Sequence, residues 1–591
     1  MTNAIPPAAV FIIGGLLIPL FKGKARALWM LFLPVAGFVL LLYTPVDTVL
    51  DCKFLDMELT LFRADRLSLL FGYIFHIISL ITVIYILNFK ETTEFVAGFV
   101  YAGAAIGAVF AGDLFTFFAF WELLTIGSVM LIWQRRTKAA MGAGFRYLLI
   151  HAFGGLVLLA GIVMYTQEQN SIHFGEIGLS GLSTWLIFVG LGVNCAWPLL
   201  HSWLTDAYPE ATIGGTVFLS AFTTKTAVYA LARAYPGAEA LIWIGVAMAA
   251  FPIFYAVIEN DLRRVLAYSL INQVGFMVVG IGIGTHLSIN GAVAHAFNDI
   301  LFKGLLFMSM GAVIHRTGKI NATDLGGLYK SMPLTALFCI IGAASISAFP
   351  LFSGFVSKSM VMEAAAHDNL TGVWLVLLFA SAGVFHHAGI KIPYFAFFSH
   401  DAGHRVEEAP LNMLIAMGIA AVLCVGIGSY PAPLYAILPF TDVVYKPYNY
   451  SHVMSQTQLL FFSALAFTML LRAGIYPAEI RATNLDSDWF YRKGGRLFFA
   501  GSDLIFNGMN RLADLIFVKG MTAALCRFAR RAPAHLTGLI LTPFWRLTGD
   551  PQTAKKEKAR MNRNFSSGTL GLGIIGLSIT AYLVILFLLN V

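Results

Sequence analysis

The chain has 591 residues, of which 58% are hydrophobic and only 12% are charged, and its mean hydropathy is +0.77. This composition excludes a soluble globular domain and predicts a protein with many transmembrane helices. The formal net charge of +8 requires no nucleic-acid partner, since basic loops that face anionic lipid account for it.

Apolar runs of roughly 17–25 residues predict an all-α, polytopic membrane protein with about sixteen transmembrane helices. The runs begin near Pro7, Trp29, Leu67, Phe95, Leu114, Phe145, Leu182, Gly215, Ala240, Ala267, Gly291, Pro333, Val373, Leu411, Leu459 and Leu570. Basic clusters such as Lys22–Arg26, Arg135–Lys138 and Lys555–Arg563 fall in loops after odd-numbered spans. The positive-inside rule therefore predicts a multi-pass protein of the cell inner membrane with both termini on the non-cytoplasmic side.

The cysteines are scattered and form no C-x-x-C pair. They are Cys52, Cys195, Cys339, Cys424 and Cys526. This arrangement predicts neither an iron–sulfur cluster nor a zinc site. The loops are mostly short and contain no phosphate-binding glycine loop, which argues against a membrane enzyme with a catalytic loop. We therefore expect no cofactor, no metal, no catalytic residue and no redox centre in this chain.

Two features lie in the first third of the chain. Residues Val46 to Arg63 alternate apolar and polar side chains, which predicts a short extramembrane hairpin between the second and third spans. The fifth span places Glu122 within the aromatic-rich segment Phe117–Leu124. A carboxylate at this depth is costly, which favours a functional site over the alternative, a hydrogen bond that helps two helices to pack.

Two later spans carry helix-breaking residues. The seventh contains Pro198, and the twelfth contains Pro350 and Gly354, followed by Lys358. Proline removes a backbone donor and frees a carbonyl group, which a membrane protein tolerates where neighbouring helices or water satisfy it. Two broken helices five spans apart are typical of a transporter built from two internal repeats.

Two further lysines lie within apolar runs. Lys225 lies near the middle of the eighth span, which favours an internal role over snorkelling of its ammonium group to the interface. Lys391 follows His386 and His387 in the thirteenth span. Consecutive histidines point to different helix faces, so packing or interfacial histidines are favoured over a metal site.

The eleventh span contains a ladder of ionisable residues. His295, Asp299 and Lys303 recur at every fourth position of the apolar segment Gly291–Phe307, so an α-helix presents all three on one face. Each such group costs roughly 2.5–3.5 kcal/mol at mid-helix on insertion scales. We therefore expect the ladder to face protein or a water-filled path, and our hypothesis is a proton relay.

The composition changes after Asn484. From Leu497 to Val518, apolar residues alternate with Asp503, Asn507, Arg511 and Asp514 at helical spacing, which predicts an amphipathic helix along the membrane. We expect six regions: N-terminal transmembrane helices (1–94), a first repeat (95–235), a second repeat (236–400), peripheral transmembrane helices (401–475), a lateral amphipathic segment on the cytoplasmic side (476–565) and an anchoring helix (566–591).

Several motifs occur together in one order. They are Trp121-Glu122, Pro198, His201-Ser-Trp-Leu204, Thr224-Lys-Thr-Ala-Val-Tyr229, Asp261-Leu-Arg-Arg264, Phe302-Lys-Gly-Leu-Leu-Phe307, Gly326-Gly-Leu-Tyr-Lys-Ser-Met-Pro333 and Gly354-Phe-Val-Ser-Lys358. With these motifs, residues from about Leu67 to Phe398 resemble the antiporter-like membrane subunits shared by Mrp-type cation/proton antiporters and respiratory complex I. The resemblance implies two inverted five-helix repeats, with a polar axis across the membrane centre.

The resemblance also implies roles for single residues. Glu122 matches the essential carboxylate of the family, Lys303 its central lysine and Lys358 the lysine of the second broken helix. His295 matches a family histidine, and Asp299 stands where the family has a second histidine. The expected proton path follows Glu122, Lys225, His295, Asp299, Lys303 and Lys358, with Lys391 as an exit or gate.

The first broken helix departs from the family pattern. Asn194 stands where the family usually has the lysine that pairs with the glutamate. Lys225, which resembles a lysine of the Mrp D-type pattern, then becomes the nearest candidate partner for Glu122. The lateral helix and final span instead resemble the largest antiporter-like subunit, which in Mrp is the A-type one.

The combined interpretation is a proton-translocating subunit of a multisubunit Mrp-type Na⁺/proton antiporter. One alternative is a proton-pumping subunit of a complex I-like NADH dehydrogenase or of a membrane-bound hydrogenase. Another is a non-transporting membrane scaffold, for which Asn194 is the best evidence. The expected partners are other membrane subunits of a hetero-oligomeric assembly, lipid, protons and Na⁺.

Overall fold

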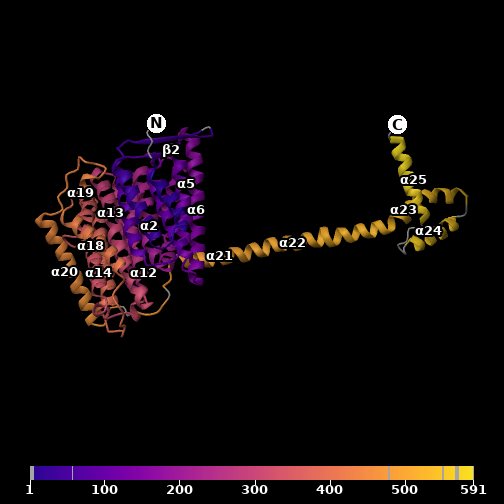
Figure 1. Ribbon diagram of the computed structural model, residues 1–591. Helices are drawn as coiled ribbons and strands as arrows, with labels where there is room; N and C mark the ends of the chain where they lie inside the picture. Colours follow the sequence, from indigo (N-terminus) through magenta and orange to yellow (C-terminus); the bar gives the residue numbers. More distant parts are fainter. Residues whose placement is uncertain are drawn as a thin grey trace. The chain divides into compact units, whose positions relative to one another are not determined.

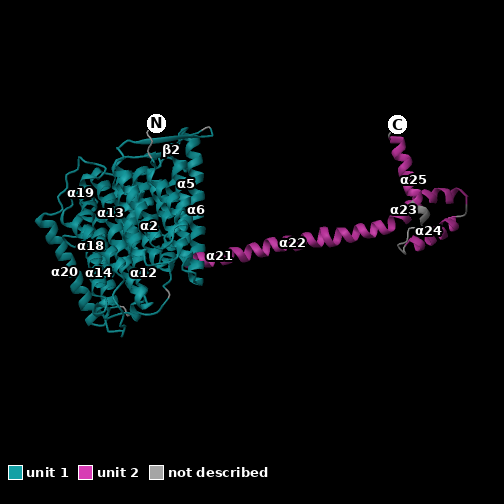
Figure 2. Cartoon of the chain, in the orientation of Figure 1, with its two compact units in different colours: residues 1–488 teal, residues 489–591 magenta. Residues whose placement is uncertain are grey.

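The computed structural model describes residues 5–55, 57–476, 479–482, 484–548, 551–565 and 572–589. The chain folds as two units, residues 1–488 and residues 489–591, which Figure 2 draws in teal and magenta. The helices of the first unit, called unit 1 below, stand side by side in a bundle (Figure 1). Unit 1 contains every residue predicted for the polar axis.

The first elements of unit 1 include the predicted hairpin. They are α1 (Pro7–Leu16), η1 (Ile18–Leu20), α2 (Gly23–Leu42), β1 (Val49–Phe54), β2 (Met57–Arg63), α3 (Arg66–Ile86) and α4 (Thr92–Phe110). Strands β1 and β2 pair antiparallel with Val49 opposite Arg63, which confirms the hairpin. The backbone N–H of Thr60 donates to Oδ2 of Asp113 at 2.8 Å and joins the hairpin to the bundle, at what is called the hairpin end below.

The middle of unit 1 contains the helices that carry the predicted site. They are α5 (Leu114–Trp133), α6 (Lys138–Gln169), α7 (Leu182–Asn194), α8 (Ser202–Ala207), η2 (Tyr208–Glu210), α9 (Ile213–Ala221), α10 (Thr223–Ala234), α11 (Glu239–Ile258), α12 (Leu262–Ile283), α13 (His286–Thr317), η3 (Ala322–Asp324), η4 (Leu328–Lys330), α14 (Pro333–Ile346) and α15 (Ser353–His367). The connections after α5, α11 and α13 lie opposite the hairpin. Arg135 and Lys319 lie in these connections and Arg264 lies in the first turn of α12, so this end is called the basic end.

The remaining elements of unit 1 include three more helices of membrane-spanning length. These elements are α16 (Thr371–Val384), η5 (Phe385–Ile390), α17 (Lys391–Pro393), η6 (Tyr394–Phe398), α18 (Leu411–Ser429), α19 (Ala432–Ala436) and α20 (Tyr450–Arg472). The helix from Thr371 to Phe398 runs without interruption, with two π-helical stretches, and α20 lies at the left edge of the bundle in Figure 1.

Eleven described helices are long and apolar enough to cross a membrane. They are α2, α3, α4, α5, α6, α11, α12, α13, the run Thr371–Phe398, α18 and α20. Shorter apolar helices occur at Pro7–Leu16, Leu182–Asn194, Pro333–Ile346 and Gly576–Leu589, and the short pair α9 and α10 occupies the predicted eighth span. The all-α polytopic class is confirmed, while the predicted start of the last span at Leu570 lies outside the described residues.

The predicted seventh and twelfth spans are interrupted in the same way. Helix α7 ends at Asn194, and the backbone then turns at Pro198. Helix α14 ends at Ile346, and the backbone turns again at Pro350. The backbone hydrogen bonds of the two turns match residue for residue. The positive φ angles also correspond, at Ala196 (58°) and Leu199 (69°) and at Ala348 (58°) and Leu351 (74°). One local backbone structure is therefore used twice, because both turns have the sequence Ala, aromatic, Pro, Leu.

Gly354 is required by the second of these turns. A Cβ atom at this position would lie 1.9 Å from the carbonyl oxygen of Ser345, which is backbone and has little freedom to shift. We expect Gly354→Ala to destabilise unit 1 by about 1–3 kcal/mol, the usual cost of overpacking. The measurement is the thermal unfolding midpoint of the purified protein in detergent. Gly372→Ala is the control, since a Cβ atom there meets open space, and equal midpoints for the two variants would contradict the prediction.

The second unit, called unit 2, begins with helical chain over residues 488–548. Its elements are α21 (Asp488–Ser502), η7 (Asp503–Asn507), α22 (Gly508–Ala513), η8 (Asp514–Met521), α23 (Thr522–Thr548), α24 (Pro551–Phe565) and α25 (Leu572–Leu589). The apolar residues Leu497, Ile505, Leu512 and Ile516 are all exposed. The predicted amphipathic segment is thus helical, and α23 packs against α24 (Figure 1).

Candidate functional site

Helix α13 forms the centre of unit 1. It begins after Thr285, whose Oγ1 accepts a hydrogen bond from the backbone N–H of Ser288 at 3.3 Å, and it ends at Gly318. The side chains of His295, Asp299 and Lys303 are fully buried, with 0% exposure. The four-residue spacing seen in the sequence therefore places three ionisable groups in the protein interior, away from lipid.

Asp299 forms a buried ion pair with a lysine of another helix. Nζ of Lys225 lies 2.6 Å from Oδ2 of Asp299, and both side chains have 0% exposure. Nζ of Lys225 also donates to the carbonyl oxygen of Ser220 at 3.0 Å. The helix is interrupted at Phe222, between α9 and α10, and this interruption leaves the Ser220 carbonyl available to the lysine. Oδ1 of Asp299 has no hydrogen-bond partner among the described residues.

Lys303 lies one helical turn beyond Asp299 on α13. Its Nζ donates to the carbonyl oxygen of Leu266 in α12, at 3.4 Å. Because residues four apart on a helix are neighbours, Asp299 and Lys303 share one face of α13. Asp299 thus forms its ion pair with Lys225 and has a second buried lysine one helical turn away.

His295 connects the ladder to the second broken helix. Its Nε2 lies 3.1 Å from Oε1 of Gln273, and its Nδ1 lies 3.0 Å from Oγ of Ser357 in α15. An amide oxygen only accepts hydrogen bonds, so Nε2 carries the proton and Nδ1 accepts from the hydroxyl group of Ser357. Nε2 of Gln273 in turn donates to Oδ1 of Asn272 at 2.6 Å. This chain of hydrogen bonds links α12, α13 and α15.

Lys358 lies next to Ser357 on α15 and uses the second break. Its Nζ donates to the carbonyl oxygen of Ile346, the last residue of α14, at 3.0 Å and lies 4.9 Å from the ring centroid of Phe276. Lys358 and Lys225 therefore have the same kind of acceptor, a carbonyl oxygen that a helix interruption leaves without its helical partner.

Glu122 lies apart from the lysines. Its side chain is half-buried on α5, and its Oε1 lies against α6, where a Cβ atom on Gly155 would approach it to 2.0 Å. Oε1 has no hydrogen-bond partner among the described residues. The expected pair between Glu122 and Lys225 is wrong, because Lys225 pairs with Asp299 in this structure. The buried amide of Asn194 also lacks a described hydrogen-bond partner.

Lys391 closes the carboxyl end of α11. Its Nζ donates to the carbonyl oxygens of Ala256 (3.3 Å), Val257 (2.6 Å) and Glu259 (2.7 Å), groups that the end of a helix leaves without partners. Nζ also lies 2.8 Å from Oε1 of Glu479. No sequence signal points to Glu479, because its loop is separated from Lys391 by the three helices α18, α19 and α20 and carries no motif.

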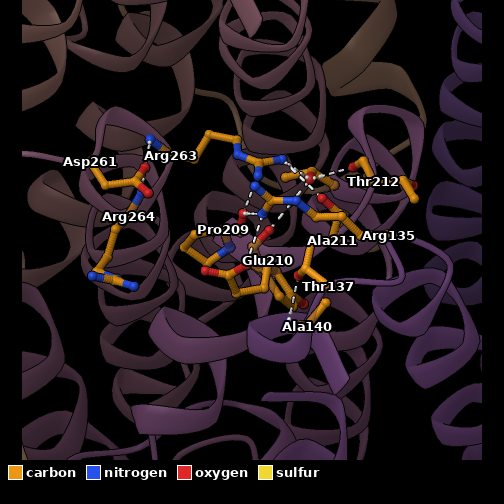
Figure 3. Close-up of polar contacts among 12 residues, drawn as sticks. Arg135, Thr137, Ala140, Pro209, Glu210, Ala211, Thr212, Asp261, Arg263 and Arg264 are labelled. Atoms are coloured by element: carbon orange, nitrogen blue, oxygen red, sulfur yellow. Dashed lines mark hydrogen bonds and ion pairs between the residues drawn. The ribbon is translucent and has the colours of Figure 1, made fainter. Parts of the chain in front are cut away.

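A buried arginine at the basic end was also missed. Arg263 follows Asp261, whose Oδ1 accepts from the backbone N–H of Arg263 at 2.8 Å and caps α12. The guanidinium group of Arg263 donates to the carbonyl oxygens of Pro209 and Ala211 (Figure 3). It also donates to Oγ1 of Thr216, at 3.0 Å. The turn between α8 and α9 is thereby held on α12. This turn joins the first broken helix to the helix pair that carries Lys225.

Arg135, in the connection after α5, supports the same turn. Its Nη1 donates to the carbonyl oxygen of Pro209 at 2.8 Å and to Oε2 of Glu210 at 2.9 Å, and Figure 3 shows both arginines directed at the turn. No cluster of three metal-ligating side chains occurs among the described residues, including the neighbourhood of His386 and His387.

Comparisons with known proteins place residues 111–386 in one family. They match the model described as "NADH:quinone oxidoreductase/Mrp antiporter, TM". The A-type component of a Na⁺/H⁺ antiporter from Alkalihalophilus pseudofirmus is 30% identical over 431 residues, which cover 64% of this chain and 53% of the relative. Hydrogenase-4 component B of Escherichia coli is 27% identical over 421 residues, covering 63% of this chain and 62% of the relative. The chain thus spans roughly half to three fifths of these relatives.

Solved structures of multisubunit membrane assemblies share the fold. A chain of the Mrp complex from Dietzia has a TM-score of 0.65 at 20% identity and covers 74% of this chain and 96% of its own length. A chain of an archaeal membrane-bound sulfane sulfur reductase has 0.68 at 23%, covering 89% and 99%. A chain of complex I from Thermus thermophilus has 0.63 at 21%, covering 72% and 97%. Residues 111–386 belong to the membrane-subunit family shared by Mrp antiporters, hydrogenase-4 component B and complex I.

Proposed function

We propose that this chain is the proton-translocating subunit of a multisubunit Mrp-type Na⁺/H⁺ antiporter in a cell inner membrane. The observation that carries the proposal is the fully buried Lys225–Asp299 ion pair, with Lys303 one helical turn farther along α13. Buried charges cost several kcal/mol and are retained in membrane bundles where they serve an ion path. The similarity to the A-type components of Na⁺/H⁺ antiporters favours the Mrp assembly.

The carboxylate of Asp299 would control the charge of Lys303. When Asp299 is paired with Lys225, its negative charge is largely neutralised and Lys303 loses electrostatic support for its ammonium form. When the pair opens, Asp299 is free to stabilise a proton on Lys303. Exchange of one carboxylate between two lysines thus couples proton uptake to proton release.

The proposed path continues on both sides of this switch. His295 and Ser357 connect it to Lys358 at the second break, Glu122 is the carboxylate at one end, and Lys391 is the exit at the basic end. The proposal also includes two inverted five-helix repeats, in residues 95–235 and 236–400, and about sixteen transmembrane spans. Both termini would lie on the non-cytoplasmic side. Residues 476–565 would lie along the cytoplasmic surface.

The test is ion transport by the assembled complex in liposomes. Lys303→Ala is expected to abolish Na⁺-dependent proton flux, measured with a pH-sensitive dye, without changing the amount of assembled complex. Lys446→Ala is the control, since this lysine is exposed on a loop. Flux at the wild-type rate from assembled Lys303→Ala would rule out the relay. Absence of flux from the wild-type complex would favour the non-transporting scaffold.

A second candidate is an antiporter-like subunit of a hydrogenase or of a complex I-like dehydrogenase. The similarity to hydrogenase-4 component B of Escherichia coli, which covers 62% of that relative, favours it. Purification of the chain with its native partners separates the candidates. Flavin and iron–sulfur proteins in the purified complex would support the second candidate, whereas small membrane subunits alone would support the antiporter.

A further inference from the structure

A segment between α20 and α21 crosses the basic end of unit 1. This segment, the described residues 479–482 and 484–487, is called the strap. Its side-chain contacts join Glu479 to Lys391, Arg481 to Asp324, Asn484 to Glu259, and Asp486 to His201 and Tyr268. The strap therefore contacts α12, the first broken helix and the helix that carries Lys391.

Asp486 anchors the strap. Both of its carboxylate oxygens lie 3.1 Å from Nε2 of His201, and its Oδ2 accepts a hydrogen bond from the hydroxyl group of Tyr268 at 2.7 Å. Burial by itself raises the pKa of Asp486, but the contacts with His201 and Tyr268 outweigh this effect and hold the pKa below its usual value. Asp486 is therefore ionised at neutral pH and keeps the strap closed over the bundle.

Glu479 belongs to the strap, and its side chain lies beside Lys391. Its side chain is only 7% exposed, and its Oε1 lies 2.8 Å from Nζ of Lys391. A second carboxylate, that of Glu259, is held nearby by the backbone N–H groups of Asn260 and Asp261 and by Nδ2 of Asn484. Burial raises the pKa of Glu479, and the charge of Glu259 raises it further, against the opposing effect of Lys391.

Two carboxylates thus flank one lysine. Arg264 completes the cluster, since its Nη1 lies 3.9 Å from Oε2 of Glu259, so the four ionised groups carry no net charge. Glu479 is the carboxylate in direct contact with Lys391, at 2.8 Å. The ammonium group of Lys391 donates to three carbonyl oxygens at the end of α11, and the neutral amine keeps two N–H donors for this group of acceptors, so Lys391 stays in position in either protonation state. Nζ of Lys391 and Oε1 of Glu479 are 2.8 Å apart, a distance that permits direct proton transfer between them.

We propose that Glu479 is a further proton-carrying residue, through which Lys391 exchanges protons with water at the basic end. In this step an N–H bond of the Lys391 ammonium group breaks and an O–H bond forms on Oε1 of Glu479, so that the amine and the carboxylic acid are both neutral. The acid then loses its proton to water at the basic end. This inference rests on the proposed function and extends its path beyond Lys391.

The experiment measures proton flux by the assembled complex with Glu479→Gln. Glutamine retains the size and the hydrogen-bonding oxygen but carries no exchangeable acid proton, so flux is expected to fall by about tenfold or more with assembly unchanged. Glu479→Asp is expected to keep most of the flux with a shifted pH profile. Arg481→Gln is the matched control, since Arg481 pairs at the surface of the same strap, and it is expected to leave flux unchanged.

Wild-type flux from an assembled Glu479→Gln complex would overturn this inference while leaving the proposed function intact. If Glu479→Gln fails to assemble, Glu479→Asp decides the question, because an unshifted pH profile would then overturn the inference. Loss of flux in Arg481→Gln to the same extent as in Glu479→Gln would likewise overturn it, since that result assigns the effect to strap packing. A wild-type complex without any flux would instead refute the proposed function.

Discussion

Asp299→Leu is expected to abolish transport and to lower the stability of unit 1. The change leaves the ammonium group of Lys225 fully buried without its carboxylate partner. Breaking a buried ion pair from one side typically costs about 3–5 kcal/mol, because the remaining charge is neither solvated nor compensated. The effect is measured as a lower thermal midpoint of the purified protein and as lost proton flux from the assembled complex.

The double variant Lys225→Met/Asp299→Leu separates the two effects. Replacing both partners of a buried pair by apolar residues of similar size is often neutral or stabilising, so the midpoint is expected to return to near the wild-type value. Transport is expected to stay absent, because the switch between Lys225 and Lys303 has been removed. Ser309→Ala, a small buried change on the same helix, is the control. A double variant less stable than Asp299→Leu would contradict the assignment of this pair.

Arg263→Ala is expected to destabilise the turn between α8 and α9 by about 2–5 kcal/mol. Arg263 is 3% exposed and donates to the carbonyl oxygens of Pro209 and Ala211 and to Thr216. Its removal takes the donor from the Ala211 carbonyl oxygen and from Oγ1 of Thr216, whereas the Pro209 carbonyl oxygen keeps Arg135, and each unsatisfied group costs about 1–3 kcal/mol. Limited proteolysis at residues 208–212, together with the thermal midpoint, measures the effect.

Arg264→Gln is the matched control for this prediction. Arg264 is the next residue on α12, but about a third of its side chain is exposed and its Nε makes one hydrogen bond, to the carbonyl oxygen of Thr205 at 3.2 Å. We expect a much smaller change in the midpoint and no new cleavage in the turn. Equal effects of the two substitutions would show that burial of Arg263 is not what holds the turn.

The polar ladder illustrates what a helical pattern determines. The four-residue spacing of His295, Asp299 and Lys303 was sufficient to place them on one face, because local backbone geometry determines this relation. The pairing of Asp299 was not predictable in the same way. Its partner, Lys225, lies on another helix, and its ammonium group is directed by the interruption at Phe222, which carries no proline signal.

At the basic end, the sequence pattern did not indicate which charged residues are buried. Glu479 and Asp486 belong to a loop of ordinary polar composition, and Arg263 looks like any basic loop residue under the positive-inside rule. Only the folded chain shows that Glu479 and Arg263 are buried and which backbone and side-chain groups they contact. The charge pattern therefore predicted on which side of the membrane these loops lie. It did not predict the buried contacts that Glu479 and Arg263 make.

By itself, the sequence determined that the chain is an all-α membrane protein of this family, and it identified the short hairpin and the ladder on one helix face. These features depend on hydropathy, residue spacing and local backbone preference, which are encoded over a few turns of chain. The tertiary structure alone decided that Asp299 pairs with Lys225 and not Lys225 with Glu122, and that Glu479 reaches Lys391. Such pairs depend on how separate helices and loops pack, and the energy of a buried charge is decided by whichever opposite charge that packing brings within a few ångströms.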